Sequence, residues 1–323
     1  MKLVVGFITY NEASAKYLAD FLPSLKKALS FLAPNEFRVF AFDNSDQDNN
    51  LNRDALESFN GVDSGFIEYL QSGSNIGFSR AYNIMIRAAK RLNAEYFLML
   101  NPDTLLETDT ISELVSAMEK DLELASVSPK IRRWDFAANT KTRIVDSCGL
   151  VLKRGLRFAD LGQGGEDDKR YDKFSILGPS GAAGLYRLSA LEKIKENEQY
   201  FDERFFMYKE DCDLAYRLFL RGAKSSLVPT AIIYHDRTAA AANGGVIKKI
   251  FERGKKSRQI RAWSFRNQHL IFVKHWSVQN LASKITIIFQ VFLFFIFSLI
   301  LEQFLLKEYS EVGRLNKVLT NVK

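Results

Sequence analysis

Acidic side chains occur at two places in this sequence where their type and spacing could do chemistry. Asp103 follows the apolar run Phe97–Leu100 in the polar turn "NPDT", whose backbone is restricted by Pro102. Glu210 and Asp211 are adjacent in "YKEDCDL". A hard divalent cation needs one or two carboxylates and takes its other ligands from substrate phosphates and water. A carboxylate beside apolar residues and another acid can have its pKa raised into the range of a general base.

Each of these motifs also has a purely structural interpretation. An Asp ahead of a helix is a common cap, and this accounts for Asp103 about as well as a metal site does on the motif alone. Acids in the first turn of a helix favour the helix dipole, which is the ordinary role of Asp213. His235 is one of three histidines and ends a predicted strand. Its imidazole could be a further metal ligand or a satisfied structural side chain.

Further polar clusters, "TYNE", "DNSD" and "SNIG", follow predicted strands in the first hundred residues. Asp43 could accept hydrogen bonds from a nucleobase or ribose, although turn formation is the ordinary role of such residues. Gly77 would let a ligand approach the backbone at a helix N-terminus, while Arg80 offers a fork for phosphate and Asn83 lies one turn further on. The GxGxxG and P-loop spacings are missing, so the sequence does not indicate a dinucleotide cofactor or a P-loop.

The elements expected to position these residues alternate between short apolar runs and helical patterns, which is typical of βαβ units on a mostly parallel sheet. The predicted strands are residues 3–8, 37–42, 65–70, 95–100, 126–131 and 226–234. Pro23 should break or kink the helix between the first two strands. The polar clusters fall at the C-terminal ends of strands, and ligands bind at that edge in open α/β sheets.

The second half of the chain is less regular. Residues 159–172 are polar and glycine-rich and predict a mobile loop. A helix is expected near residues 109–120, and another follows Glu210, with Gly222 as its C-terminal cap. The length of 323 residues suits one large domain with additions, or two domains.

The cysteines and the N-terminus indicate a reducing compartment. Cys148 and Cys212 are the only cysteines, and they are far apart without a CxxC spacing, so neither a disulfide framework nor a zinc site is indicated. The apolar run after Lys2 is too short for a signal peptide. We therefore expect the protein to be cytoplasmic or at the cytoplasmic face of the inner or plasma membrane.

Positive charge is concentrated near one apolar segment. Nine Lys or Arg residues and the single acid Glu252 lie between Ala241 and Trp276, whereas the whole chain has a net charge of +7. Ile285–Leu301 follows, with Gln290 and Ser298 among its few polar residues, and is just short of the ~20 residues that span a bilayer. Membrane attachment is favoured over an ordinary core helix. RNA-binding motifs are missing, so no nucleic-acid partner is expected.

Taken in order, "FITYNE", "FDNSD", "SNIGFSRAYN", "NPDT", "GPSGAAGLYR", "FDERFFMYKEDCDLAYRL" and "YHDRT" resemble the family-2 inverting glycosyltransferases. The nearest branch is the rhamnosyltransferase-like one, which builds bacterial surface polysaccharides such as O-antigen. The resemblance covers roughly residues 1–275. It implies a GT-A fold, a Rossmann-like α/β arrangement with a mixed, mostly parallel sheet flanked by helices, to which the C-terminal apolar helical segment is added.

The resemblance also implies roles for individual residues. Asp103 would be the carboxylate that binds Mg²⁺ or Mn²⁺, with His235 completing the metal site, and Asp211 would be the general base beside Glu210 as a second catalytic acid. Nucleotide-sugar contacts are implied at Thr9, Asn11, Glu12, Asp43, Asn75, Gly77, Arg80, Asn83 and Asn101, and acceptor contacts at Gly181 and Ala182. Asn101 replaces the first Asp of the commoner DxD pattern, which makes metal dependence less secure.

The resemblance implies transfer of a sugar, with rhamnose as one candidate, from a dTDP- or UDP-sugar to a hydroxyl of a lipid-linked or saccharide acceptor. The expected units are a catalytic domain at 1–240, divided into a nucleotide half at 1–120 and an acceptor half at 121–240, a basic segment at 241–276 and membrane-associating helices at 277–323. The candidate diphosphate contacts are Arg80, Arg237, Arg266 and Lys274. A polyprenyl-phosphate sugar synthase of the same fold is the alternative.

Overall fold

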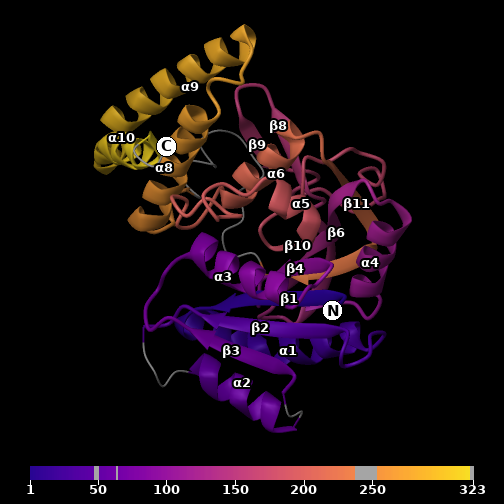
Figure 1. The fold of residues 1–323 in the computed structure, drawn as a ribbon. Helices are drawn as coiled ribbons and strands as arrows, with labels where there is room; N and C mark the ends of the chain where they lie inside the picture. Colours follow the sequence, from indigo (N-terminus) through magenta and orange to yellow (C-terminus); the bar gives the residue numbers. More distant parts are fainter. Residues whose placement is uncertain (47–50, 63–64, 237–252, 321–323) are drawn as a thin grey trace.

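The computed structural model shows a mixed sheet with helices on both faces and a group of helices beyond one end (Figure 1). It describes residues 1–46, 51–62, 65–236 and 253–320. Arg237 and the basic residues as far as Glu252 lie outside the described residues.

One sheet runs through the molecule in the order β3-β2-β1-β4-β10-β6-β11-β5, with β7 paired to β6. The strands are β1 (Leu3–Thr9), β2 (Phe37–Asp43), β3 (Ile67–Gln71), β4 (Tyr96–Leu100), β5 (Thr104–Leu106), β6 (Leu124–Asp135), β7 (Thr140–Ser147), β10 (Ala183–Arg187) and β11 (Lys224–His235). β3, β2, β1 and β4 are parallel to one another, while β10 is antiparallel to β4 and β6. The predicted mixed α/β sheet is confirmed.

Helices cover both faces because side chains on a strand alternate. On one face lie α1 (Asn11–Leu29), α2 (Leu51–Val62) and α4 (Thr110–Lys120), and on the other α3 (Phe78–Arg91), α5 (Leu188–Lys193) and α6 (Glu210–Leu220). In β1, Val5 packs in the first of these layers and Val4 in the second. Position 6 of β1 requires glycine, because a Cβ there would lie 2.6 Å from Cζ of Phe97.

The expected break at Pro23 is wrong, because α1 continues through it from Asn11 to Leu29. The helix packs Phe21, Leu22 and Leu25 in the core, each at most 2% exposed. Burial of a large apolar side chain is worth about 1.5–3 kcal/mol. Three such side chains outweigh the roughly 3 kcal/mol by which a proline disfavours a helix interior.

The predicted mobile loop at residues 159–172 is also wrong. The hairpin of β8 (Leu150–Lys153) and β9 (Arg157–Asp160) leads into it. Further on, the Asp167 carboxylate is 2% exposed and pairs with Lys130 at 2.9 Å and Arg132 at 2.5 Å. Burial alone would raise the pKa of Asp167, but the hydrogen bonds from these two cations lower it. The segment is therefore anchored to β6.

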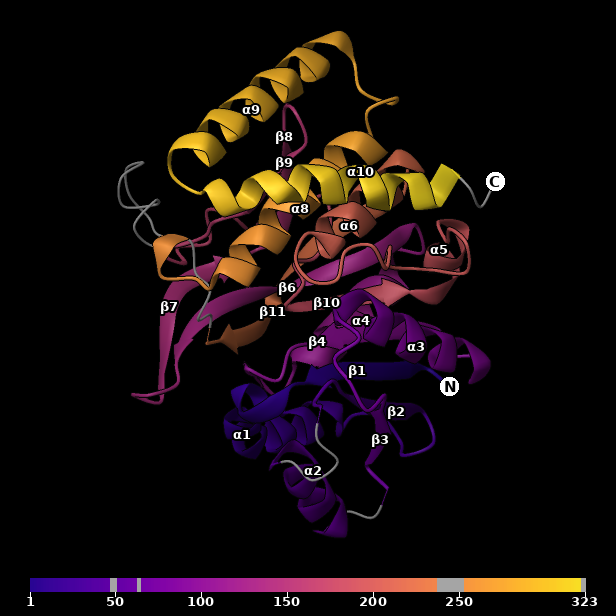
Figure 2. The same cartoon turned by 90° about the vertical axis from the view of Figure 1, so that its left-hand side faces the viewer.

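The C-terminal helices are α8 (Arg258–Lys274), α9 (Leu281–Ile300), the short 3₁₀ helix η1 (Gln303–Leu305) and α10 (Leu306–Thr320). They lie at the end of the molecule remote from α2 (Figure 2). α8 joins them to the helices that cover the sheet, since Leu270 and Ile271 of α8 share an apolar cluster with Cys212 and Tyr216 of α6. Within the described part of the chain, α9 alone is long and apolar enough to cross a membrane.

Several charges of the predicted basic segment are used inside the protein. Arg253 and Arg261 both pair with Glu302, at 2.9 and 2.6 Å. Arg266 lies 3.7 Å from Glu308. These three cations therefore fasten the helical group together instead of forming a free basic surface.

Candidate active site

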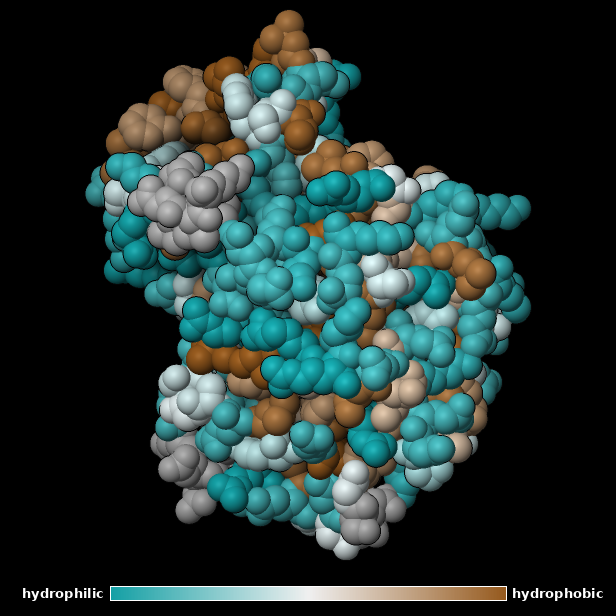
Figure 3. All heavy atoms as spheres, viewed as in Figure 1, coloured by the Kyte–Doolittle hydropathy of each residue, from teal (hydrophilic) through white to brown (hydrophobic). Residues whose placement is uncertain are grey.

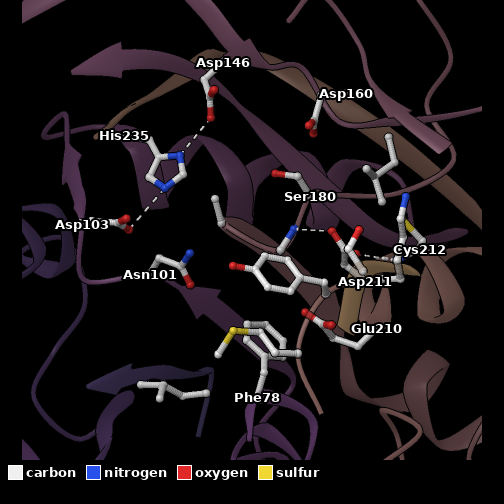
Figure 4. Close-up of a pocket in the computed structure, with 18 of the residues that line it drawn as sticks. Phe78, Asn101, Asp103, Asp146, Asp160, Ser180, Glu210, Asp211, Cys212 and His235 are labelled. Carbon is white, nitrogen blue, oxygen red and sulfur yellow. Dashed lines mark hydrogen bonds and ion pairs between the residues drawn. The ribbon is translucent and has the colours of Figure 1, made fainter. Parts of the chain in front are cut away.

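A cavity of about 480 Å³ opens where β4, β11 and the start of α6 meet. Its lining includes seven of the residues proposed from the sequence, namely Asn101, Asp103, Gly181, Ala182, Glu210, Asp211 and His235. Figure 4 shows Asp103 and His235 on one side of the cavity, and Asp211 and Glu210 on the other. Residues from four separate parts of the sequence thus converge at one place.

The turn that carries Asp103 is held by backbone hydrogen bonds. Asn101 N donates to the Ala182 carbonyl at 2.9 Å, and the Thr104 hydroxyl donates to the Asn101 carbonyl at 2.6 Å. β5 then pairs with β11 so that Thr104 lies opposite His235. This register brings Asp103 beside His235, so the turn is both a connector and part of the site.

The His235 imidazole lies between two carboxylates. Its Nε2 is 3.3 Å from Oδ1 of Asp103, and its Nδ1 is 2.9 Å from Oδ2 of Asp146 (Figure 4). Burial alone would lower the pKa of His235, but the negative charges of Asp103 and Asp146, together with the hydrogen bond to Asp146, outweigh it and raise the pKa to about 10. Asp146 was missed from the sequence because it lies at the end of β7, a strand that the sequence pattern did not predict.

The residues around Asp103 fit a divalent cation. Oδ1 of Asp103 is buried without a hydrogen-bond partner and faces the imidazole nitrogen of His235. Asp146 would fix the orientation of that imidazole, as outer carboxylates commonly do for histidine ligands. The described residues contain no cluster of three or more potential ligands. Mg²⁺ and Mn²⁺ often take their remaining ligands from substrate phosphates and water, so two protein ligands suffice.

Asp211 lies in the first turn of α6, and its carboxylate accepts hydrogen bonds from two backbone amides. Its Oδ2 accepts from Gly181 N at 2.9 Å and its Oδ1 from Cys212 N at 2.7 Å. A Cβ at position 181 would lie only 3.3 Å from that Oδ2, so glycine permits the close approach. The Asp211 carboxylate is therefore fixed in orientation at the cavity wall, as a general base must be.

Glu210 differs from Asp211, although both line the cavity. Glu210 is 5% exposed, and its Oε2 is buried without a hydrogen-bond partner. Burial, and then the charge of Asp211, raise its pKa well above the usual value. The sequence suggested a raised pKa for a carboxyl in this acidic pair, and burial with a neighbouring acid produces it at Glu210.

Most residues proposed for nucleotide-sugar contact lie outside the cavity lining. These are Thr9, Asn11, Glu12, Asp43, Asn75, Gly77, Arg80 and Asn83. Asp43 is fully buried and accepts hydrogen bonds from the hydroxyls of Thr9, Ser45 and Tyr69. Asn75 accepts from Gly77 N, Asn11 N donates to Ser45, and Glu12 is exposed in the first turn of α1.

Gly77, Arg80 and Asn83 support the segment that leads to α6. A Cβ on Gly77 would lie 2.6 Å from the carbonyl oxygen of Phe206. The group that lies close to this glycine in the structure is therefore the backbone of Phe206. Asn83 is fully buried and donates to the Phe201 carbonyl at 2.8 Å, while Arg80 pairs with Glu203 at 3.0 Å. In the structure their contacts are made within the protein, and the phosphate contacts expected of Gly77 and Arg80 stay a prediction.

Arg266 and Lys274 likewise form ion pairs within the protein. Neither lines the cavity. Lys274 is 8% exposed and pairs with Asp202 at 2.8 Å and Asp213 at 2.9 Å. The expectation that these two cations contact a diphosphate is therefore not supported by their positions.

The family model described as "Glycosyl transferase family 2" matches residues 4–195. A similar protein is the N-acetylglucosaminyl-diphospho-decaprenol L-rhamnosyltransferase of Mycobacterium tuberculosis, 28% identical over 53% of this chain and 59% of that protein. The low-salt glycan biosynthesis hexosyltransferase Agl10 of Haloferax volcanii is 28% identical over 47% of this chain and 46% of that protein. The chain thus matches less than two thirds of the length of either relative.

Among solved structures, a mannosyltransferase from Pyrobaculum calidifontis in complex with GDP-Man and Mn²⁺ covers 95% of this chain and 84% of its own. Its TM-score is 0.50 and its sequence identity 13%, so this similarity concerns the fold alone. The sheet order and this similarity agree with the GT-A fold expected from the sequence.

Proposed function

The chain belongs to glycosyl transferase family 2, and from this we propose that it is an inverting glycosyltransferase of cell-surface polysaccharide synthesis. It would move a sugar from a nucleoside-diphosphate sugar to a hydroxyl of a lipid-linked or saccharide acceptor. The observation that carries the proposal is the cavity with Asp103 and His235 facing Asp211. One side suits a diphosphate with its cation, and the other suits a hydroxyl that must lose a proton.

The reaction proposed for this cavity is a single displacement. Asp211 accepts the proton of the acceptor hydroxyl as its oxygen bonds to the anomeric carbon, and the bond from that carbon to the diphosphate oxygen breaks, so the nucleoside diphosphate leaves with the bonding electrons. General-base catalysis of this kind typically contributes ~10² to 10⁴ in rate. One displacement inverts the configuration at the anomeric carbon. Gly181 N and Cys212 N hold the carboxylate in place throughout.

Asp103 and His235 would hold Mg²⁺ or Mn²⁺ in this proposal, and the cation would take the place of the proton that the neighbouring carboxylates favour on His235 Nε2 in its absence. When bound, the ion supplies positive charge beside the departing diphosphate. Asp146 keeps the His235 Nε2 directed toward Asp103. The resemblance seen in the sequence makes dTDP- and UDP-sugars donors to test, and the names of similar proteins add GDP-sugars, put a rhamnosyl donor first and make a lipid diphosphate the first acceptor.

We propose the domain organisation expected from the sequence, with a catalytic unit at 1–240, a basic segment at 241–276 and membrane-associating helices at 277–323. Pairing of β10 with β4 supports the single catalytic unit, because it joins the nucleotide half to the acceptor half in one sheet.

Membrane attachment at the cytoplasmic face is proposed through α9. Apolar side chains gather over this helix at the top of the molecule (Figure 3). Those on its exposed surface include Leu281, Ile285, Ile288, Phe289, Phe292 and Leu293. Lys153, Arg154 and Arg157 are exposed on the β8–β9 hairpin, whose turn contacts α9 through the hydrogen bond from Gln290 Nε2 to the Gly155 carbonyl at 2.9 Å. Basic side chains beside an apolar face suit an anionic bilayer surface.

The test is thermal stability of detergent-purified protein against UDP, dTDP, GDP and NAD, each with and without Mn²⁺. Ligand at a hundred times its dissociation constant adds about 2.7 kcal/mol, which raises the melting temperature by a few degrees. We expect a Mn²⁺-dependent shift with one nucleoside diphosphate that Asp103→Ala abolishes. Folded protein that responds to none of them would overturn the proposed function.

A further inference from the structure

The cavity is strongly acidic, with one cationic side chain of the Lys or Arg type among the described residues that line it. The acids of the lining are Asp103, Asp146, Asp160, Glu210 and Asp211. The cation is Lys209, which immediately precedes Glu210. Within the described chain, no carboxylate oxygen lies within 4.0 Å of its Nζ. An ammonium without an ion-pair partner in such a cavity is available to an anionic ligand.

The backbone that presents Lys209 is held in an unusual conformation. Tyr208 and Lys209 both adopt left-handed geometry, with φ of 74° and 72°. For residues other than glycine this conformation costs roughly 1–2 kcal/mol each. Asn267 of α8 is fully buried, and its Nδ2 donates to the carbonyls of Met207 at 2.8 Å and Tyr208 at 2.7 Å. The hydrogen bonds from Asn267 therefore fix the backbone from which the Lys209 side chain projects. Strained residues fixed in this way by their surroundings cluster at functional sites.

Lys209 lies on the side of the cavity formed by the β8–β9 hairpin. Its Nζ is 6.0 Å from the ring centroid of Phe158, which also lines the cavity. Leu150 and Leu156 of the hairpin belong to the same apolar cluster as Ile287 of α9, and Phe158 packs against that cluster. Apolar surface therefore runs from the proposed membrane helix to the cavity wall beside Lys209.

We propose that Lys209 binds the phosphate groups of an acceptor whose sugar is linked through a diphosphate to an apolar chain. This inference rests on the proposed function. In the proposed function the donor diphosphate binds at Asp103 and His235. A second diphosphate in the same cavity would lie beside the five acidic side chains of the lining, so it needs a further cation. Lys209 supplies it, with the hairpin as the path for the apolar chain and Asp211 beside the acceptor sugar.

The experiment measures binding of farnesyl diphosphate, farnesol and inorganic diphosphate to the full-length protein in detergent with EDTA, and separately the binding of the nucleoside diphosphate panel with Mn²⁺. The variants are Lys209→Met, Lys209→Arg and Lys169→Met. Lys169 is the matched control, because it is an exposed lysine with a φ of 68° outside the cavity. All variants share one detergent, so partition of the probe into micelles is the same for each.

We expect Lys209→Met to weaken farnesyl diphosphate about ten- to a hundredfold, the usual effect of losing a hydrogen bond to a charged group. Lys209→Arg and Lys169→Met should stay near wild type, and nucleotide binding should not change. The inference is overturned if farnesyl diphosphate does not bind, if inorganic diphosphate or farnesol binds equally well, or if Lys209→Met weakens the nucleotide instead. Loss of all nucleotide binding in wild-type protein would instead count against the proposed function, so the two failures are distinguishable.

Discussion

Glu210 should make the protein less stable as the pH rises through the neutral range. Its carboxyl is buried, and burial together with the charge of Asp211 raises its pKa well above the ordinary value of 4.5. Between pH 4.5 and the raised pKa, the unfolded chain has released this proton while the folded protein retains it. The folded state then binds more protons, so the free energy of unfolding falls with increasing pH. The slope is about 1.4 kcal/mol per pH unit, which over the roughly 2.5 units from pH 4.5 to pH 7 amounts to at most about 3 to 4 kcal/mol.

Glu210→Gln keeps the shape of the side chain and removes its titration. We expect the variant and the wild type to have similar stability at pH 5, and the variant to be more stable by up to about 4 kcal/mol at pH 7.5. The measurement is urea unfolding of both proteins from pH 5 to 8.5. Glu68→Gln is the control, because Glu68 is exposed on β3, and its curve should parallel that of the wild type.

Parallel pH profiles for Glu210→Gln and the wild type would refute the reasoning, since they would mean that Glu210 titrates alike in the folded and unfolded states. The same variant also separates the roles of the two acids. Asp211 is the proposed base, so Glu210→Gln should keep most of the transferase activity.

Three other predictions concern the remaining parts of the site. Asp211→Asn should lower the rate of sugar transfer by about 10² to 10⁴ and leave the nucleotide-induced melting shift intact, whereas near-normal rates would favour a polyprenyl-phosphate sugar synthase, which needs no base for a hydroxyl. Asp146→Asn should weaken Mn²⁺ about 10- to 100-fold in calorimetry, because the His235 imidazole loses its orienting partner; unchanged affinity would exclude this role. Asn267→Ala should lower the free energy of unfolding by about 1–3 kcal/mol, and it should also slow sugar transfer by protein that is still folded. The neighbouring Gln268→Ala is the control and should lower stability without slowing transfer by the folded protein.

The nucleotide half could be predicted because its periodicity is local. The predicted strands at 3–8, 37–42, 65–70 and 95–100 lie within two residues of β1, β2, β3 and β4. Parallel strands bring their C-terminal ends to one edge. That rule placed Asp103 at the edge where the cavity lies. The resemblance put His235 in the same site, but the pairing of β5 with β11 that brings the two together was not predicted.

The hairpin region and the role of Asp146 could not be predicted, because they depend on contacts between distant residues. The polar segment at 159–172 is ordered by the pairing of Asp167 with Lys130 on β6, thirty-seven residues earlier in the chain. Gly77 illustrates a different limit. A glycine with positive φ at a helix N-terminus indicates close approach of some group, but the sequence does not say whether that group is a ligand or, as here, the Phe206 carbonyl.

The position of Asp211 depends on the C-terminal helices as much as on the sheet. Asp213, one turn into α6, is fully buried and contacts Lys274 at 2.9 Å and His275 at 2.8 Å at the end of α8. Burial alone would raise the pKa of Asp213, but Lys274, Arg217 and His275 hold it well below its usual range. Such a buried cluster gains little net stability, because desolvation offsets most of the attraction between the charges. Its directional contacts instead fix α6 against α8.

α8 therefore links the proposed membrane surface to the proposed base. It holds α6 through Asp213, holds the strained turn before Glu210 through Asn267, and packs Phe265 against Phe294 of α9. A membrane-bound acceptor would approach along α9 and the hairpin, so the helix proposed to meet the bilayer and the carboxylate proposed to meet the acceptor hydroxyl belong to one packed unit. The family match ends at residue 195, before all of these contacts. The residues that distinguish this protein's acceptor should accordingly be sought between Lys209 and the end of α9.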